Sequence, residues 1–117
     1  MIRIKDGVTF IYSIGGFPIL QAIKTSSRML NKDFTITSGS DGEHNGIDDP
    51  HHFGDAYDVR SKDLDTVTKQ QFLAELNNLL PKDKFYYFLE DEGTDNEHFH
   101  IQVRKGIKFT IQDYLSA

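Results

Sequence analysis

The chain has 117 residues, of which 38% are hydrophobic and 26% charged, a composition typical of one ordinary globular domain over residues 1–117. It has no cysteine, which excludes disulfides and thiolate metal sites, and a net charge of −5 without any Lys/Arg cluster argues against nucleic acid as a partner. No apolar run approaches the ~18 residues that span a membrane, so we expect no membrane contacts. The first ten residues lack a signal-peptide pattern, so we expect the protein to be made in the cytoplasm. We also expect a monomer.

The first half of the chain predicts a hairpin, a helix, a strand and a long loop. Residues 3–13 place apolar residues on both sides of an Asp-Gly turn pair, which is typical of a hairpin. Residues 17–31 predict a helix with a proline in its first turn and apolar residues near one face. Residues 34–37 predict a strand. Residues 38–53 form a loop rich in Gly, Asp, Pro and His, and a loop of that length in a small domain is usually functional.

The second half predicts strands, turns and a second helix. Thr68 and Gln71 can form a capping box at the start of a helix that Pro81 ends. Strands are predicted over residues 56–60, 84–90 and 98–104, an acidic turn over residues 90–97, and a short terminal helix over residues 109–117. This mixed order of elements predicts an α+β fold with a small antiparallel sheet and two main helices.

The strand over residues 98–104 alternates apolar and polar side chains. A period of two puts its apolar side chains on one face and His98, His100 and Gln102 on the other. Such a face can simply be a solvated surface, which alternation by itself produces. It can equally present a pair of ligands, because imidazole is the commonest metal ligand in proteins.

The segment "HHFGDAYDVR", residues 51–60, favours the ligand pair. A histidine at a loop end, then a glycine, then an aspartate inside a strand allow the chain to turn back so that two side chains meet. With one histidine from strand 98–104 the set is His, His and Asp. Three such ligands leave a fourth tetrahedral position for water, the pattern of a catalytic zinc site. The segment alone does not choose between His51 and His52.

Glu97 is the carboxylate best placed to serve such a site. A base near the metal could take a proton from the water, whose pKa zinc lowers to about 7. Glu97 stands three residues before His100, and in a regular strand these two side chains face opposite sides. The role therefore requires Glu97 to lie in the turn that precedes the strand.

Together these motifs resemble the zinc D-Ala-D-Ala peptidase family. The pattern is His51-x-x-Gly54-x-Ala56-x-Asp58 followed by Glu97-His98-x-His100. The segments "ITSG" (36–39) and "EHN" (43–45) also look like that family's loop before the first ligand, so the resemblance runs from about Ile36 to Val103. The family includes D-alanyl-D-alanine carboxypeptidases and dipeptidases and the L-alanyl-D-glutamate endopeptidases of phage endolysins. The resemblance implies their fold, which they share with the hedgehog signalling domain.

The resemblance also implies a role for each matching residue. The family spaces its first histidine seven residues before the Asp ligand, which selects His51, with Asp58 and His100, as the Zn²⁺ shell. Glu97 matches the family's base, and His98 matches a histidine that lines the site and stabilises the transition state.

Around this shell, Ser38, Asp41 and His52 are expected at the substrate-binding rim. Asp55 is expected at the surface, and Arg60 in a structural salt bridge.

One departure from the family affects the substrate. Members usually carry an arginine just after the "SG" segment, where it holds a substrate carboxylate or carbonyl, whereas Asp41 stands there in this chain. An aspartate would repel a free terminal carboxylate and tolerate an internal peptide bond. Members also tend to have Ser two residues before the first His, where this chain has Asp49. An endopeptidase is therefore predicted in preference to a D-Ala-D-Ala carboxypeptidase.

The acidic loops offer a second metal interpretation. Residues 41–52 carry acids or an amide at positions 1, 3 and 5 and Gly at position 6, like a calcium loop, but end in His52 where an EF-hand needs Glu. A looser secondary Ca²⁺ site in residues 41–49 or 90–97 is the remaining alternative, beside solvated acidic loops.

Two functional hypotheses follow. The first is a zinc metallopeptidase of phage or prophage origin, an endolysin-like hydrolase that cleaves peptidoglycan stem peptides and acts on the cell wall after release. The alternative is a non-catalytic metal-binding module of the same fold, in a virion or in cell-wall recognition. Asp41 favours the module, and the presence of Glu97 favours the enzyme, because a binder has no need of a base.

Overall fold

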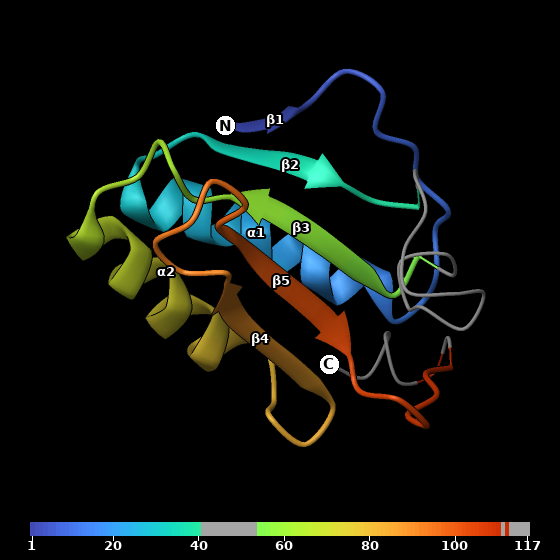
Figure 1. Cartoon of the computed structure of the whole chain (residues 1–117). Helices are drawn as coiled ribbons and strands as arrows, with labels where there is room; N and C mark the ends of the chain where they lie inside the picture. Colours follow the sequence, from blue (N-terminus) through green and yellow to red (C-terminus); the bar gives the residue numbers. More distant parts are fainter. Residues whose placement is uncertain (41–53, 111, 113–117) are drawn as a thin grey trace.

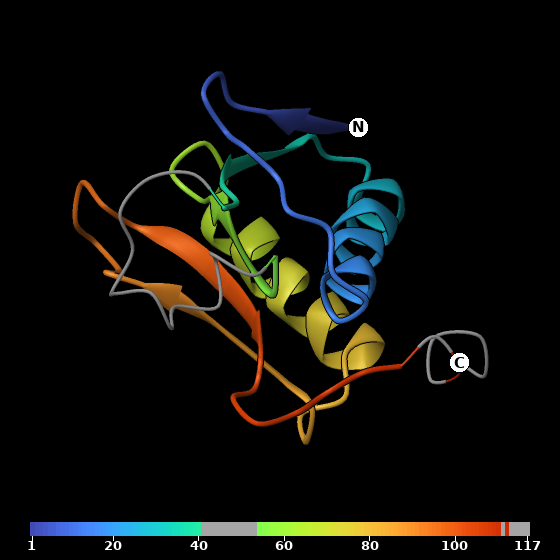
Figure 2. The ribbon, with the colours of Figure 1, turned by 90° about the vertical axis from the view of Figure 1, so that its right-hand side faces the viewer.

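The computed structural model describes residues 1–40, 54–110 and 112, and it places both helices on one face of a five-stranded sheet (Figures 1 and 2). The elements are β1 (Ile2–Ile4), α1 (Gly16–Leu30), β2 (Phe34–Ser38), β3 (Ala56–Arg60), α2 (Thr66–Leu79), β4 (Phe85–Glu90) and β5 (His98–Val103). The α+β class is thus confirmed. In the described part of the chain, no helix is long and apolar enough to cross a bilayer.

The sheet is mixed rather than antiparallel throughout, which corrects the sequence prediction. Its strand order is β1-β2-β3-β5-β4. The pairs β2/β3, β3/β5 and β4/β5 are antiparallel, but β1 runs parallel to β2. The reason is the connection between these two strands: α1 carries the chain back to the end of the sheet from which β1 started, as a parallel pair requires.

The hairpin predicted over residues 3–13 is also wrong. A turn does form at Gly7, whose φ is 87°. Within the residues described, however, no strand follows that turn before α1. The Thr9 carbonyl instead accepts a hydrogen bond from the Ser40 N–H at 2.8 Å, so a contact with the chain beyond β2 replaces the local pairing.

Helix α2 begins earlier than the predicted capping box. Asp65 is its N-cap, and Oδ1 of Asp65 accepts a hydrogen bond from the Thr68 N–H at 2.7 Å. A carboxylate at this position satisfies a free backbone donor and is attracted by the positive end of the helix dipole. The prediction of Thr68 as the cap, with Gln71, is therefore wrong.

The first predicted helix and the predicted strands are confirmed to within one residue at each end, whereas most of the loop predicted over residues 38–53 lies outside the described residues. The terminal helix predicted over residues 109–117 lies mostly outside the described residues, because residue 111 and residues 113–117 are not among them.

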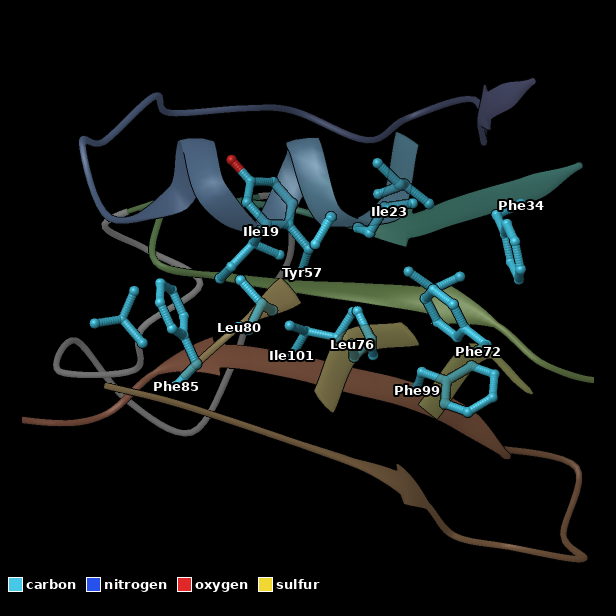
Figure 3. Packing of buried hydrophobic residues seen from close by; sticks show 14 residues of the cluster. Ile19, Ile23, Phe34, Tyr57, Phe72, Leu76, Leu80, Phe85, Phe99 and Ile101 are labelled. Carbon is cyan, nitrogen blue, oxygen red and sulfur yellow. The ribbon is translucent and has the colours of Figure 1, made fainter. Parts of the chain in front are cut away.

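The hydrophobic core fills the space between the two helices and the sheet (Figure 3). Phe72 of α2 stacks on Phe34 of β2 with 4.4 Å between ring centroids, and it meets Phe99 of β5 edge-on at 4.8 Å. Such aromatic pairs add to the stabilisation from buried area and fix the helix against both strands. The buried members of the core are Ile19, Ala22, Ile23, Phe34, Ile36, Tyr57, Val59, Phe72, Leu76, Leu80, Phe85, Phe99, Ile101 and Val103.

Since alternate side chains of each strand point into this core, their neighbours point to the other face. On that face the register sets Asp58 of β3 opposite His100 of β5, and Arg60 opposite His98. Across β2, Ser38 is the partner of Asp58. Burial of the apolar residues therefore gathers polar side chains from three strands on the face away from the helices.

Candidate metal and substrate site

Asp58 and His100 meet at the centre of this polar face. As cross-strand partners they bring Asp58 Oδ1 within 3.1 Å of His100 Nδ1. Two atoms that are each bonded to a tetrahedral zinc ion at ~2.0–2.1 Å lie about 3.3–3.4 Å from one another. The observed separation is close to that value, so a small side-chain displacement would admit an ion between the two atoms. This pair fits two positions of a zinc shell.

Gln102 fixes the orientation of His100. Its Nε2 donates to the Val103 carbonyl at 3.2 Å, which leaves Oε1 to accept from His100 Nε2 at 2.6 Å. A proton held on Nε2 leaves Nδ1, beside Asp58, as the nitrogen that can bind a metal, the arrangement usual for metal-binding histidines. Burial alone would lower the pKa of His100, but the hydrogen bonds to Asp58 and Gln102 and the negative charges of Asp58 and Glu90 outweigh it and raise the pKa.

His98 lies beside this pair and is held by two acceptors. Its Nδ1 donates to the Asn96 carbonyl at 2.6 Å, and its Nε2 lies 2.9 Å from Glu90 Oε1 and 3.8 Å from Asp58 Oδ2. A carbonyl and a carboxylate both accept hydrogen bonds, so each ring nitrogen of His98 faces an acceptor. The ring is thus a donor aimed at the same region as Asp58.

Glu97 lies in the turn before β5, outside the regular pleat, as its expected role requires. Lys69 of α2 donates to both carboxylate oxygens, at 3.1 and 3.0 Å, and the Glu97 side chain is only 8% exposed. The hydrogen bonds from Lys69 lower the pKa of Glu97 below its ordinary value. Glu97 is therefore ionised, as a base must be, but its basicity is reduced while Lys69 holds it.

A pocket of about 370 Å³ opens beside these residues, on the polar face of the sheet. Four of the residues predicted from sequence line it together: Ser38, Asp58, Glu97 and His98. His100 adjoins it through Asp58. The pocket is thus next to the pair that could hold a metal, and its walls carry the side chains expected to move protons.

Gly54 sets the path of the chain into β3. Its φ is 76°, and a Cβ at this position would lie 1.8 Å from the Ile11 carbonyl oxygen. Asp55, expected at the surface, is instead half-buried: its Oδ1 accepts from the Ser13 hydroxyl at 2.5 Å, and that hydroxyl accepts from the Gly16 N–H at 2.8 Å. Through Asp55, three residues before Asp58, the start of β3 is fixed to the start of α1.

Replacing Gly54 by alanine is expected to destabilise the protein by more than the ~1–2 kcal/mol that a left-handed backbone costs a residue with a Cβ, because the clash with Ile11 adds to that cost. Gly93→Ala is the matched control, since Gly93 has a φ of 82° but nothing within 4 Å of a Cβ. Chemical denaturation of both variants measures the difference. Equal losses of unfolding free energy would show that the close approach to Ile11 has no energetic weight.

Three of the predicted site residues lie outside the described part of the chain: Asp41, His51 and His52. Among residues 1–40, 54–110 and 112, no group of three His, Asp or Glu side chains is placed to hold a metal ion. A complete zinc shell would need a third ligand from outside the described residues, where His51 is the predicted one.

The calcium alternative concerns two segments. Residues 41–49 are not described. In residues 90–97, protein side chains already engage four carboxylates: Glu90 by His98, Asp91 by the Asn96 amide, Asp95 by Lys62, and Glu97 by Lys69.

Sequence reasoning missed three residues of this site. Gln102 shares the polar face of β5 with the two histidines, and that alternation could have suggested its contact with His100. Glu90 stands at the end of a predicted strand, but only its register with His98 brings them together. Lys69 lies on a helix 28 residues away from Glu97, and no local pattern indicates the pair.

Comparison with known proteins identifies no relative of this chain. No protein-family model matches the chain, and neither the curated proteins nor the solved structures contain a match.

Proposed function

We propose that the protein is a zinc-dependent peptidase that cleaves peptidoglycan stem peptides, of the D-Ala-D-Ala peptidase class and its hedgehog-like fold. The observation that carries the proposal is the contact between Asp58 and His100, at 3.1 Å, on the wall of a pocket that also contains Glu97 and His98. In this assignment His51, Asp58 and His100 bind the zinc ion. We propose that this peptidase is of phage or prophage origin and acts on the cell wall after its release.

The residues around the pocket divide the chemistry between them. A bound zinc ion would supply a Lewis acid that makes a water molecule nucleophilic at neutral pH. Glu97 would act as general base and then as general acid, accepting a proton from the attacking water and passing it to the leaving amine. His98, a donor fixed by Asn96 and Glu90, stabilises the oxyanion that forms at the peptide carbonyl. Ser38 and, at the rim, His52 and Asp41 would contact the substrate.

The expected reaction is internal cleavage of the stem peptide. The sequence supports this through Asp41, which replaces the arginine that would hold a free terminal carboxylate. Two like charges ~4 Å apart repel by about 4 kcal/mol at an effective dielectric of 20, an upper estimate that solvent and zinc reduce without changing the sign. An internal amide carries no such charge.

Digestion of purified peptidoglycan tests the proposal. Zinc-loaded protein should release stem-peptide fragments with new amino termini, chelation should stop their release, and added zinc should restore it. Mass spectrometry identifies the bond that is cleaved. Free D-alanine or D-Ala-D-Ala as the main product would contradict the endopeptidase assignment, and the absence of any zinc-dependent fragment would contradict the hydrolase.

One observation favours the alternative, a metal-binding module without turnover. Both oxygens of Glu97 are held by Lys69 in a largely buried ion pair, which is also how a purely structural carboxylate is held. A module would bind zinc and cell-wall peptide without cleaving it. The digestion experiment separates the two, because the module predicts binding with no new amino termini.

A further inference from the structure

The lining of the pocket carries as many carboxylates as lysine and arginine side chains, but the carboxylates already have partners. Its walls carry three carboxylates, and each has a cationic or proton-donating partner: Asp58 has His100 at 3.1 Å, Glu97 has Lys69 at 3.0 Å, and Asp95 has Lys62 at 4.0 Å. The pocket also carries Lys5 and Arg60. Throughout the described residues, no carboxylate lies within ion-pair distance of either of these two side chains.

Arg60 was expected in a structural salt bridge, and the described residues offer it none. It lies two residues after Asp58 on β3, so both side chains project from the same face with their Cα atoms about 7 Å apart. Its cross-strand partner is His98, whose ring is itself a donor. Lys5 directly follows β1 and adds a second positive charge to the same pocket. An anion entering the pocket would therefore meet two positive side chains that no carboxylate of the described residues pairs with, close to the candidate metal pair.

We propose that Arg60, assisted by Lys5, binds a carboxylate of the substrate next to the scissile bond. A guanidinium pairs with a carboxylate through two parallel hydrogen bonds, which fixes orientation as well as position. This inference rests on the proposed function and names its substrate: a stem peptide with a free acid within the chain. The γ-linked D-glutamate of a stem peptide carries such an acid, because its α-carboxylate does not take part in the peptide chain.

A carboxylate-binding role for Arg60 is compatible with cleavage of an internal peptide bond. An arginine placed to hold a chain terminus favours trimming of the last residue, whereas Arg60 would hold an acid that branches from the middle of the peptide. The protein should then discriminate between stem peptides whose glutamate is a free acid and those in which it is amidated, since the amide lacks the charge that Arg60 recognises.

Binding measured without turnover tests this. The probes are two synthetic peptides, L-Ala-γ-D-Glu-L-Lys with a free α-carboxylate and the same peptide with an α-carboxamide, titrated into the full chain after removal of metal. Calorimetry or NMR shifts should give an affinity for the acid roughly 10- to 100-fold higher than for the amide, the usual worth of a charge-assisted hydrogen bond. Arg60→Gln should remove that preference and leave binding of the amide unchanged.

Two further variants provide controls. Arg60→Lys keeps the charge and should retain part of the preference. Arg3→Gln changes net charge equally, but Arg3 pairs with Asp33 at 2.9 Å and does not line the pocket, so the preference should be intact. The preference should also weaken as salt screens the charges.

Each result decides the inference. Equal affinity of the wild-type protein for the two peptides, no binding of either, or an equal loss in Arg3→Gln would overturn it. Preferential binding of the acid by metal-free protein, with no cleavage by the zinc-loaded protein, would support the role of Arg60 and contradict the peptidase. Equal affinity of the metal-free protein for the two peptides, with cleavage of both by the zinc-loaded protein, would support the peptidase and contradict the role of Arg60.

Discussion

Replacing Asp58 by alanine is expected to abolish zinc binding while the protein remains folded. Asp58 would supply one of three protein ligands, and its loss should cost more than the 10- to 100-fold drop in affinity that changes behind the ligands usually cause. Wild-type protein purified without added metal should contain about one zinc per chain, and the variant essentially none. Elemental analysis gives the content, and circular dichroism confirms that the fold is retained.

A graded variant separates direct ligation from orientation. Gln102→Leu removes the acceptor that holds the proton on His100 Nε2, so zinc affinity should fall roughly 10- to 100-fold without being lost. Gln71→Leu changes an exposed glutamine of α2 in the same way and should leave affinity unchanged. The ligand assignment is wrong if Asp58→Ala keeps its zinc, and His51 is the wrong loop ligand if His52→Ala loses zinc while His51→Ala does not.

Glu97→Gln is expected to retain zinc and lose about 10²–10⁴-fold in the rate of peptide cleavage, the usual worth of a positioned general base. Glutamine is nearly the same size but cannot take a proton. It would also face Lys69 without a negative charge, so stability has to be followed in parallel. Rates from chromatography of released fragments, at equal zinc content, measure the effect.

The matched control is Glu92→Gln in the exposed acidic turn that precedes Glu97, which should cleave at the wild-type rate. A Glu97→Gln variant that is as active as wild type would mean that another group takes the proton. A variant that unfolds, with its zinc lost, would indicate instead that the ion pair with Lys69 is the main role of Glu97.

Local patterns in the sequence predict both helices, four of the five strands and the polar face of β5. The apolar period of 3.6 in the two helices and of two in β5 identified them to within a residue or a turn, because burial of one face imposes that period whatever the partner is. The same alternation placed His98, His100 and Gln102 together. The proximity of Asp58 to His100 was an expectation from motif spacing, and the register of β3 with β5 brings the two side chains into contact.

The pairing of strands and of charges depends on contacts between segments that are distant in the sequence. The Asp-Gly turn near the N-terminus predicts a hairpin, yet β1 pairs with β2 across α1, because pairing between distant segments depends on the packing of the whole sheet and not on local propensity. Position 54 requires glycine because the carbonyl of Ile11, 43 residues earlier in the chain, leaves no room for a Cβ. Lys69 reaches Glu97 from a helix, whereas Arg60 meets no carboxylate within the described residues. Which charges in the pocket are compensated is thus a property of three-dimensional proximity, since attraction between charges depends on their separation in space and not along the chain.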